Sequence, residues 1–208
     1  KAFDSMRLKL REEAKKNDWV VLQVSGYEAD DLIHVASKVL TVGQETVMIG
    51  SDRDLLQLVD SNNQMILFNQ KGLRLVRRET FERDTVHGKI PGYRNPTEFL
   101  TGKILQGDRS DNVLGFKKDE GKKGIGEKGA WDLVQKYVTF KNMIKRTPVH
   151  PELKIRSEEK LLDTLICDQG EMKPVQFFEF NRKLIDISHV ASSSYLQQIC
   201  IDQYNSQV

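Results

Sequence analysis

The feature of this 208-residue sequence that most restricts its fold is the alternation of short apolar runs with helical patterns in its first half. Residues 19–24 and 45–50 are apolar runs of the length of a buried strand, and both are rich in β-branched side chains. Residues 29–40 lie between them and repeat their apolar side chains at helical period. Strands that alternate with helices predict an α/β fold with a mostly parallel central sheet flanked by helices.

The strand pattern ends near residue 85, and the rest of the sequence is helical. Before that point, residues 64–68 and 73–76 are expected to form two strands joined by a hairpin turn at residues 69–72. Helical periodicity predicts helices over residues 3–17, 97–106, 127–137, 157–168 and 192–204. We therefore expect an α/β region at residues 1–85 and a helical region at residues 86–208.

Composition restricts the class of protein. Hydrophobic residues make up 38% and charged residues 30% of the chain, which are proportions of a soluble globular protein. No apolar run approaches the ~20 residues that cross a bilayer, so no membrane partner is expected. The two cysteines, Cys167 and Cys200, suggest neither a disulfide framework nor a zinc site, which favours the cytoplasm. With 32 basic and 30 acidic side chains, the net charge of +2 identifies no partner by itself.

Three short acidic motifs carry the chemistry that the sequence suggests. Residues 26–31 follow the first predicted strand and residues 50–54 follow the second, so both motifs are expected at the same edge of the sheet. Residues 107–112 follow a predicted helix, and their two outer aspartates, three residues apart, are expected to share one helical face. The carboxylates of the three motifs are Glu28, Asp30, Asp31, Asp52, Asp54, Asp108 and Asp111.

Acidic residues at helix N-termini often serve only as caps, and this is the alternative for each motif taken alone. Several carboxylates crowded at one sheet edge would repel one another, however, and such a group requires a cation. Oxygen ligands without nearby His or Cys favour Mg²⁺ or Mn²⁺ over Zn²⁺. Two such ions about 4 Å apart are typical of sites that cleave phosphodiesters, so we expect phosphoryl transfer on nucleic acid.

A Gly- and Lys-rich stretch precedes the helix predicted at residues 127–137. Glycines at a helix start allow close approach of a phosphate, and the surrounding lysines suggest contacts to a DNA backbone. An ordinary turn and a solvated, charge-mixed loop are the alternatives. Residues 71–94 hold seven basic side chains as a second possible DNA track, whereas Trp19, Trp131 and His34 are interpreted as packing residues. The predicted DNA-binding residues are Lys122, Lys123, Gly124, Ile125, Gly126 and Lys128.

Taken in order, these motifs resemble the 5′-nuclease (flap endonuclease) family. Residues 26–31 read Gly-Tyr-Glu-Ala-Asp-Asp and residues 51–58 read Ser-Asp-Arg-Asp-Leu-Leu-Gln-Leu, both similar to signatures of that family. Residues 107–112 and 124–128 are similar to its last metal ligands and to its helix–three-turn–helix DNA-binding element. The likeness is specific over residues 26–130, and a looser one to the ribonuclease H of the T-even phages extends over residues 181–205.

The resemblance implies a PIN-like nuclease core followed by a helical DNA-binding region, and a 5′-3′ nuclease that removes RNA primers or 5′ flaps. It implies that Glu28, Asp30 and Asp31 serve a first divalent ion. It also implies that Asp52 bridges, with Asp54 beside it, and that Asp108 and Asp111 serve a second ion. Asp31 and Asp52 are the expected catalytic residues. The implied partners are branched or duplex DNA, RNA–DNA hybrid, a phage single-strand-binding protein and a K⁺ ion at the loop.

The family begins with a strand bearing an early metal-binding aspartate and then a helical arch, and the sequence does not match these parts. Asp4 is interpreted as a helix residue, because only 22 residues separate it from Gly26. We therefore expect a truncated chain that binds Mg²⁺ weakly and cleaves poorly. The alternatives are a non-catalytic DNA-binding module that retains the acidic residues, and an RNA-cleaving relative that shares only the α/β core.

Overall fold

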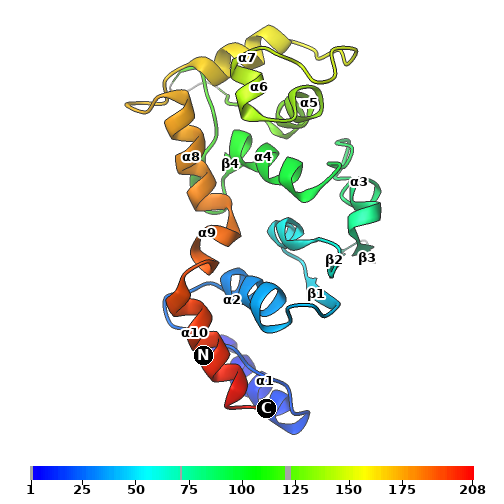
Figure 1. The fold of residues 1–208 in the computed structure, drawn as a ribbon, viewed down its shortest axis with the longest axis vertical. Helices are drawn as coiled ribbons and strands as arrows, with labels where there is room; N and C mark the ends of the chain where they lie inside the picture. Colours follow the sequence, from blue (N-terminus) through cyan, green and yellow to red (C-terminus); the bar gives the residue numbers. More distant parts are fainter. Residues whose placement is uncertain (1, 71, 120–122) are drawn as a thin grey trace. The chain divides into compact units, whose positions relative to one another are not determined.

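A computed structural model describes residues 2–70, 72–119 and 123–208 and divides the chain into two compact units (Figure 1). Unit 1 combines Lys1–Thr46 with Ile187–Val208, so it brings both ends of the sequence into one body. Unit 2 is the intervening segment, Val47–Asp186. Each unit has buried side chains of its own and is described separately.

Unit 1 is built from helices. Its core consists of Val35, Ala191, Leu196 and Cys200, which are all fully buried. Helix α2 supplies the first of these residues and packs against α9 and α10, which supply the others. The elements of this unit are α1 (Ala2–Lys16), α2 (Ala29–Val35), η1 (Ala36–Leu40), α9 (Ile187–Ala191) and α10 (Ser194–Asn205).

The prediction of a strand at residues 19–24 is wrong, because this segment pairs with side chains of a helix instead of with a neighbouring strand. Gln203 lies on α10 and Gln207 lies two residues after the end of that helix, and each side-chain amide both donates to and accepts from the backbone of residue 23 or residue 21. The interpretation of Trp19 as a packing residue is also wrong, because 63% of this side chain is exposed.

A three-stranded sheet leads into unit 2, with the order β1–β2–β3. The strands are β1 (Thr46–Gly50), β2 (Asn63–Asn69) and β3 (Gly72–Val76). Strands β2 and β3 are antiparallel, and Met65 opposes Val76 while Phe68 opposes Leu73, which confirms the predicted hairpin. This mixed α/β arrangement has a smaller sheet than the mostly parallel one that the sequence predicts, because residues 19–24 contribute no strand.

The remainder of unit 2 is mainly helical. Helix α4 lies at its centre and packs against η2, α5 and α8. The ring of Phe140 stacks on that of Phe178 and contacts that of Phe116 at a tilt. Helix α4 begins as predicted, since Asn95 caps the Glu98 N–H and Pro96 occupies the first turn. The elements are η2 (Arg53–Leu58), η3 (Arg78–Thr80), α3 (Phe81–Asp84), α4 (Pro96–Gln106), β4 (Gly107–Asp108), β5 (Val113–Leu114), α5 (Glu127–Tyr137), α6 (Phe140–Ile144), α7 (Glu158–Ile166) and α8 (Pro174–Ile185).

The helices expected in the second half of the sequence are confirmed at α4, α5, α7 and α10, each within two residues of its predicted ends. Across the described residues, no helix is both long enough and apolar enough to cross a membrane.

Candidate functional site

The second acidic motif lies on a turn that the core of unit 2 holds in place. Asp52 caps η2 by accepting a hydrogen bond of 2.9 Å from the Asp54 N–H. The apolar residues that follow, Leu55 and Leu56, are buried and anchor η2. A short polar turn on a buried apolar helix thus fixes the position of the Asp54 carboxylate.

The third acidic motif lies on a tight hairpin, and the prediction that its aspartates share a helical face is wrong. Helix α4 ends at Gln106 because Gly107 has a φ of +74°, and β4 then pairs antiparallel with β5. A Cβ atom at Gly107 would lie 2.3 Å from the Gly115 nitrogen, so only glycine fits this bend. Asp108 and Asp111 therefore come together through a turn.

The two turns bring three carboxylates together. Asp54, Asp108 and Asp111 each offer an oxygen atom, and these oxygen atoms all lie within 4.8 Å of one another. Asp54 and Asp108 are largely buried, whereas Asp111 is exposed. This group, hereafter the aspartate cluster, joins residues that are more than fifty positions apart in the sequence.

Lys103 neutralises part of the aspartate cluster. Its Nζ lies 2.6 Å from Asp54 Oδ1 and also donates to Asp108 Oδ2. Burial alone would lower the pKa of Lys103, but Asp54 and Asp108 outweigh burial and raise that pKa. Sequence reasoning missed this lysine, although its position one turn before the end of α4 and five residues before Asp108 is visible in the sequence.

The pKa values of Asp54 and Asp108 shift in opposite directions. Burial raises the pKa of Asp54, and the attraction of Lys103 only partly offsets it. Burial would also raise the pKa of Asp108, but hydrogen bonds from Lys103 and Ser110 outweigh it and lower that pKa to about 2. Ser110 contributes through its backbone N–H at 2.9 Å and through its hydroxyl group. Asp108 is thus ionised at neutral pH.

The first acidic motif lies in unit 1 at the start of α2. Asp31 is buried, and its carboxylate accepts a hydrogen bond of 3.1 Å from the Glu28 N–H. Asp30 accepts a hydrogen bond of 3.1 Å from the Asp31 N–H. The acidic side chains of this motif thus bind backbone N–H groups at the start of α2, as the capping alternative expects. That Glu28, Asp30 and Asp31 meet the aspartate cluster stays a prediction.

The Gly-rich loop before α5 is anchored by its middle residue. Ile125 is buried and donates its N–H to the Phe116 carbonyl at 2.8 Å, so any DNA contact by this residue would use its backbone. A Cβ atom at Gly124 would lie 2.5 Å from the same carbonyl oxygen. Gly126 precedes the first turn of α5 and accepts from the Ala130 N–H.

The charged side chains around this loop differ in availability. Lys123 is exposed, whereas Lys128 forms an ion pair of 2.5 Å with Asp132 and lies 4.2 Å from the centre of the Trp131 ring. Lys122 lies outside the described residues. Trp131 donates its indole N–H to the Gly92 carbonyl, which is consistent with a packing role.

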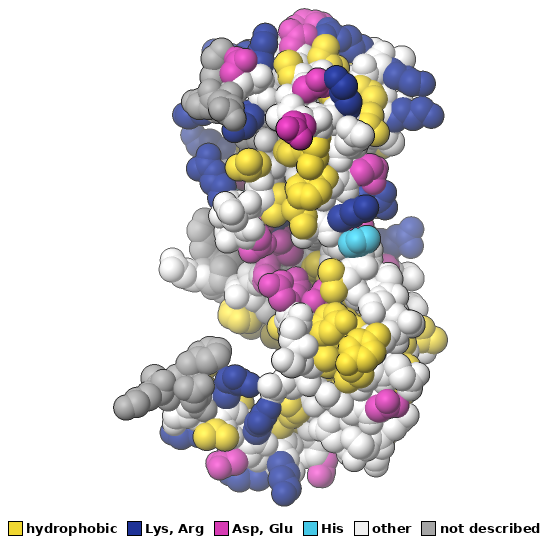
Figure 2. Space-filling view, turned by 90° about the vertical axis from the view of Figure 1, so that its left-hand side faces the viewer, with side chains coloured by type: hydrophobic (Ala, Val, Ile, Leu, Met, Phe, Trp, Pro, Cys, Tyr) yellow, Lys and Arg dark blue, Asp and Glu magenta, His cyan; other side chains and the backbone are white. Residues whose placement is uncertain are grey.

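Most arginines of the second predicted DNA track are engaged within the fold. Arg74 donates to the Asp84 carbonyl, Arg83 pairs with Asp84, and Arg94 pairs with Glu98. Figure 2 shows Lys and Arg side chains interspersed with Asp and Glu side chains on the face in view. These three arginines are therefore less available for phosphate contacts than unpaired basic side chains would be.

Arg53 connects the acidic turn with the loop region. It lies between Asp52 and Asp54 in the sequence, and its guanidinium group lies 3.6 Å from Glu127, the first residue of α5. It also donates to the Thr85 carbonyl at 3.3 Å. The aspartate cluster and the start of α5 are thus tied to each other within unit 2.

Comparison with known proteins gives relatives for this chain. Residues 4–90 match the family described as 5′-3′ exonuclease, N-terminal resolvase-like domain. A 5′-3′ exonuclease of Mycoplasma pneumoniae is 31% identical over 82% of this chain and 52% of its own length. A 5′-3′ exonuclease of Bacillus subtilis is 33% identical over 62% of this chain and 40% of its own length. The chain thus spans about half the length, or less, of these curated relatives.

Solved structures of a bacteriophage T5 nuclease share the fold. The T5 5′-exonuclease with bound zinc gives a TM-score of 0.63 at 17% identity over all of this chain and 71% of that chain. The T5 flap endonuclease in a pseudo-enzyme-product complex with DNA and metal ions gives 0.64 at 17% identity, over 96% of this chain and 67% of that one. These likenesses support the PIN-like α/β core.

Proposed function

We propose that this chain, whose residues 4–90 match the 5′-3′ exonuclease, N-terminal resolvase-like domain, acts as a metal-dependent, structure-specific 5′-3′ nuclease on DNA. The observation that carries this proposal is the aspartate cluster, in which two sequence-distant turns direct three carboxylates to one point beside a buried lysine. Like charges this close repel one another, and Lys103 pairs with two of the three carboxylates, so a divalent ion would offset repulsion that remains at Asp111.

The aspartate cluster fits a hard divalent cation. Its members are aspartates alone, and oxygen donors at this spacing suit Mg²⁺ or Mn²⁺. The Lys103 ammonium group pairs with two of them, so the site already holds one positive charge. Asp54, Asp108 and Asp111 would hold the ion, and when bound it would stabilise the negative charge that develops on a phosphodiester during hydrolysis.

The other acidic residues complete this proposal. Asp52 would bridge toward a first ion served by Glu28, Asp30 and Asp31, and Asp31 and Asp52 would be the catalytic pair. The two-ion arrangement is supported by the match of residues 4–90 to the 5′-3′ exonuclease domain and by the position of Asp52 on the same turn as Asp54.

DNA would be held by the loop before α5, acting as a helix–three-turn–helix element. The N–H groups of the first turn of α5, the exposed Lys123, and Lys128 would contact phosphates, together with Lys122, Gly124, Ile125 and Gly126. We also propose a K⁺ ion at the loop, RNA–DNA hybrid as a second substrate, a phage single-strand-binding protein as a partner, and action in the cytoplasm.

A flap-cleavage assay tests the proposal. The natural full-length protein is expected to cleave a labelled 5′-flap substrate with Mg²⁺ but not with EDTA, and Asp108→Asn should lower the rate at least 100-fold. Asp168→Asn replaces an exposed aspartate and is the matched control. Full activity of Asp108→Asn, or activity in EDTA, would contradict the proposal.

One observation favours a second candidate, a DNA-binding module without catalysis. Lys103 already pairs with two of the three aspartates, so the cluster is tolerable without a metal ion. Titration calorimetry with Mn²⁺ separates the candidates, because a nuclease must bind the ion at the aspartate cluster and lose that binding in Asp108→Asn, whereas a pure binding module shows no such heat.

A further inference from the structure

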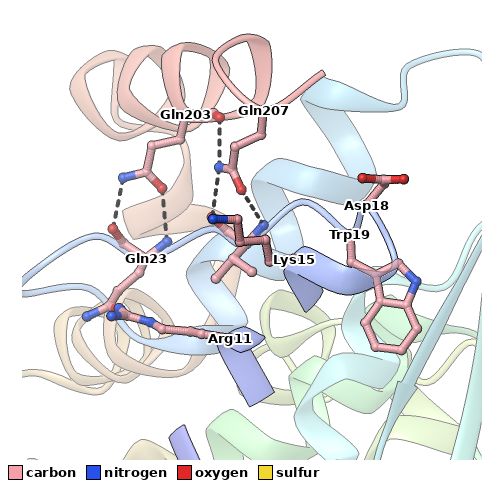
Figure 3. A pocket seen from close by; sticks show the side chains of 8 residues that line it. Arg11, Lys15, Asp18, Trp19, Gln23, Gln203 and Gln207 are labelled. Atoms are coloured by element: carbon pink, nitrogen blue, oxygen red, sulfur yellow. Dashed lines mark hydrogen bonds between the residues drawn. The ribbon is translucent and has the colours of Figure 1, made fainter. Parts of the chain in front are cut away.

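A cavity of about 560 Å³ lies in unit 1, apart from every residue assigned above to catalysis or metal binding. Helix α1 contributes Arg11 and Lys15 to its wall, and the chain that follows contributes Asp18 and Trp19 (Figure 3). With two basic side chains and one acidic side chain, the lining carries a net positive charge. A cavity of this size accommodates one nucleotide or a similar small group.

Two glutamine side chains that line the cavity, Gln203 and Gln207, already use their amide groups in hydrogen bonds to the backbone. Gln203 lies 2.9 Å from the backbone N and O atoms of Gln23, and Gln207 lies 3.0 and 3.1 Å from those of Val21. Since each glutamine amide uses both its donor and its acceptor on the backbone, both side chains are held in one arrangement. The groups that remain available to a ligand are therefore on the wall.

Trp19 presents an aromatic face at this wall. Its side chain is 63% exposed, although its backbone N–H is fixed by a hydrogen bond of 2.9 Å to the Ala14 carbonyl. An exposed indole on a fixed backbone offers an apolar face together with a polar N–H to a ligand. Figure 3 shows the Trp19 ring extending from the same short segment as Asp18.

The two cations lie one helical turn apart on α1. Arg11 donates one guanidinium N–H to the Gln23 side chain and keeps other N–H groups for a ligand. Lys15 forms no ion pair or hydrogen bond with any residue that the structure describes, in contrast to the neighbouring Lys16, which pairs with Glu13 at 2.6 Å. An aromatic face beside basic side chains with free N–H groups is the combination that binds unpaired nucleotides.

We propose that this cavity binds a segment of single-stranded nucleic acid, with a base stacked on Trp19 and the adjoining phosphates at Arg11 and Lys15. The inference rests on the proposed function, since it takes the substrate to be nucleic acid. It adds a contact for an unpaired strand outside the aspartate cluster. Duplex DNA does not fit this role, because its bases are already stacked and offer no face to the indole.

Tryptophan fluorescence tests the stacking directly. In the variant Trp131→Phe of this 208-residue chain, Trp19 is the sole tryptophan, because the 208 residues contain only two. Adding a single-stranded oligothymidylate in EDTA should quench its emission saturably, and a duplex of equal length should quench it much less. The absence of quenching, or equal quenching by duplex, would overturn the proposal.

Binding of a fluorescein-labelled oligothymidylate, followed by anisotropy, tests the residues. Trp19→Ala should weaken binding about tenfold and Trp19→Phe less, because phenylalanine still stacks. Lys15→Gln should reduce the slope of log affinity against log salt by about one, whereas Lys16→Gln, an equal charge change on the same helix, should not. Equal effects of the two lysine variants would show that only net charge matters and would overturn the proposal.

The two proposals fail separately. Asp108→Asn abolishes cleavage if the proposed function is right, but it should leave the quenching of Trp19 in EDTA unchanged. Quenching without any cleavage or metal binding would leave the cavity proposal standing and remove the nuclease. Mg²⁺-dependent cleavage without quenching of Trp19 would support the nuclease and overturn the cavity proposal.

Discussion

Lys103 is the residue whose interactions bear most directly on the aspartate cluster. Its ammonium group is only 14% exposed and contacts two carboxylates that are themselves nearly buried. A buried ion pair gains little over apolar packing when intact, but the loss of one partner leaves an uncompensated charge. Lys103 therefore offsets the charge of Asp54 and Asp108, and it would compete with a divalent ion for the same oxygen atoms.

Replacing Lys103 by methionine tests this competition. We expect Lys103→Met to lower the free energy of unfolding in EDTA by about 3 kcal/mol, because Asp54 and Asp108 then face each other without a cation. Mg²⁺ should recover most of that loss, as measured by urea denaturation with and without the ion. Lys128→Met removes an exposed ion pair and should cost less than about 1 kcal/mol in both conditions. Equal losses with and without Mg²⁺ would show that Lys103 and the ion do not compete.

Gly107 is the second residue on which the cluster depends. Its φ of +74° and ψ of −179° belong to a region that is essentially restricted to glycine, and an added Cβ would meet the Gly115 nitrogen at 2.3 Å. Gly107→Ala should cost roughly 3 kcal/mol in urea denaturation and weaken Mn²⁺ binding, because the hairpin that presents Asp108 is displaced. Gly126→Ala is the matched control, since its Cβ would meet nothing within 4 Å. A Gly107→Ala protein of normal stability would contradict this account of the bend.

At the scale of elements, helices α5 and α7 are joined by a charged contact. Glu158, the first residue of α7, accepts from Lys136 at 2.8 Å and from the Tyr137 hydroxyl group at 2.5 Å. Burial alone would raise the pKa of Glu158, but these two hydrogen bonds outweigh it and lower that pKa. The stabilisation is therefore present above the ordinary carboxyl pKa of 4.5 and is lost as the pH falls through the lower pKa of the folded state.

Glu158→Gln should show this pH dependence. We expect a loss of about 2 kcal/mol at neutral pH and a smaller loss below pH ~4, where the wild-type carboxylate also becomes protonated. Thermal melts from neutral pH down to pH ~3 measure both. Glu159→Gln changes the adjacent residue, which is 77% exposed and pairs with Arg146, and it should change stability little at any pH. A pH-independent difference between Glu158→Gln and wild type would contradict the assignment.

At the scale of the whole molecule, the most distant parts of the sequence meet in unit 1. Gln203 and Gln207 bind the backbone of residues 21 and 23, across 180 or more positions, where a neighbouring strand would otherwise pair. The sequence analysis divides the chain at residue 85, between a region with strands and a helical region. That these two regions have separate functions stays a prediction. The compact units, by contrast, divide the chain after Thr46 and after Asp186.

Removal of both glutamine amides tests how firmly α10 holds the opening segment. The double variant Gln203→Ala/Gln207→Ala should lose about 2 kcal/mol of stability, because four backbone groups then lose their partners. Hydrogen exchange of the Val21 and Gln23 amides should accelerate by a corresponding factor of about thirty. Gln198→Ala, an exposed position on the same helix, is the control. Unchanged exchange at Val21 and Gln23 would show that other contacts hold the segment.

Local patterns predicted much of this protein. Helical period and capping residues identified α4, α5, α7 and α10, and the turn residues identified the hairpin between β2 and β3, because these signals act between neighbours in the sequence. The same reasoning failed at residues 19–24, where an apolar run was interpreted as a strand. Its backbone partners are side chains far along the chain, and no local pattern encodes them.

For the candidate site too, the sequence predicted some features and only the tertiary structure decided others. The acidic motifs were evident as patterns of residues, since carboxylates at the ends of strands and helices are a local feature. The tertiary structure decided that Asp54, Asp108 and Asp111 meet, that a glycine bend and not a helical face joins the last two, and that Lys103 lies among them. It also decided that Trp19 remains open beside Lys15. The physical reason is that charge, shape and short-range hydrogen bonds are properties of single residues and turns, whereas proximity and burial depend on how the whole chain packs.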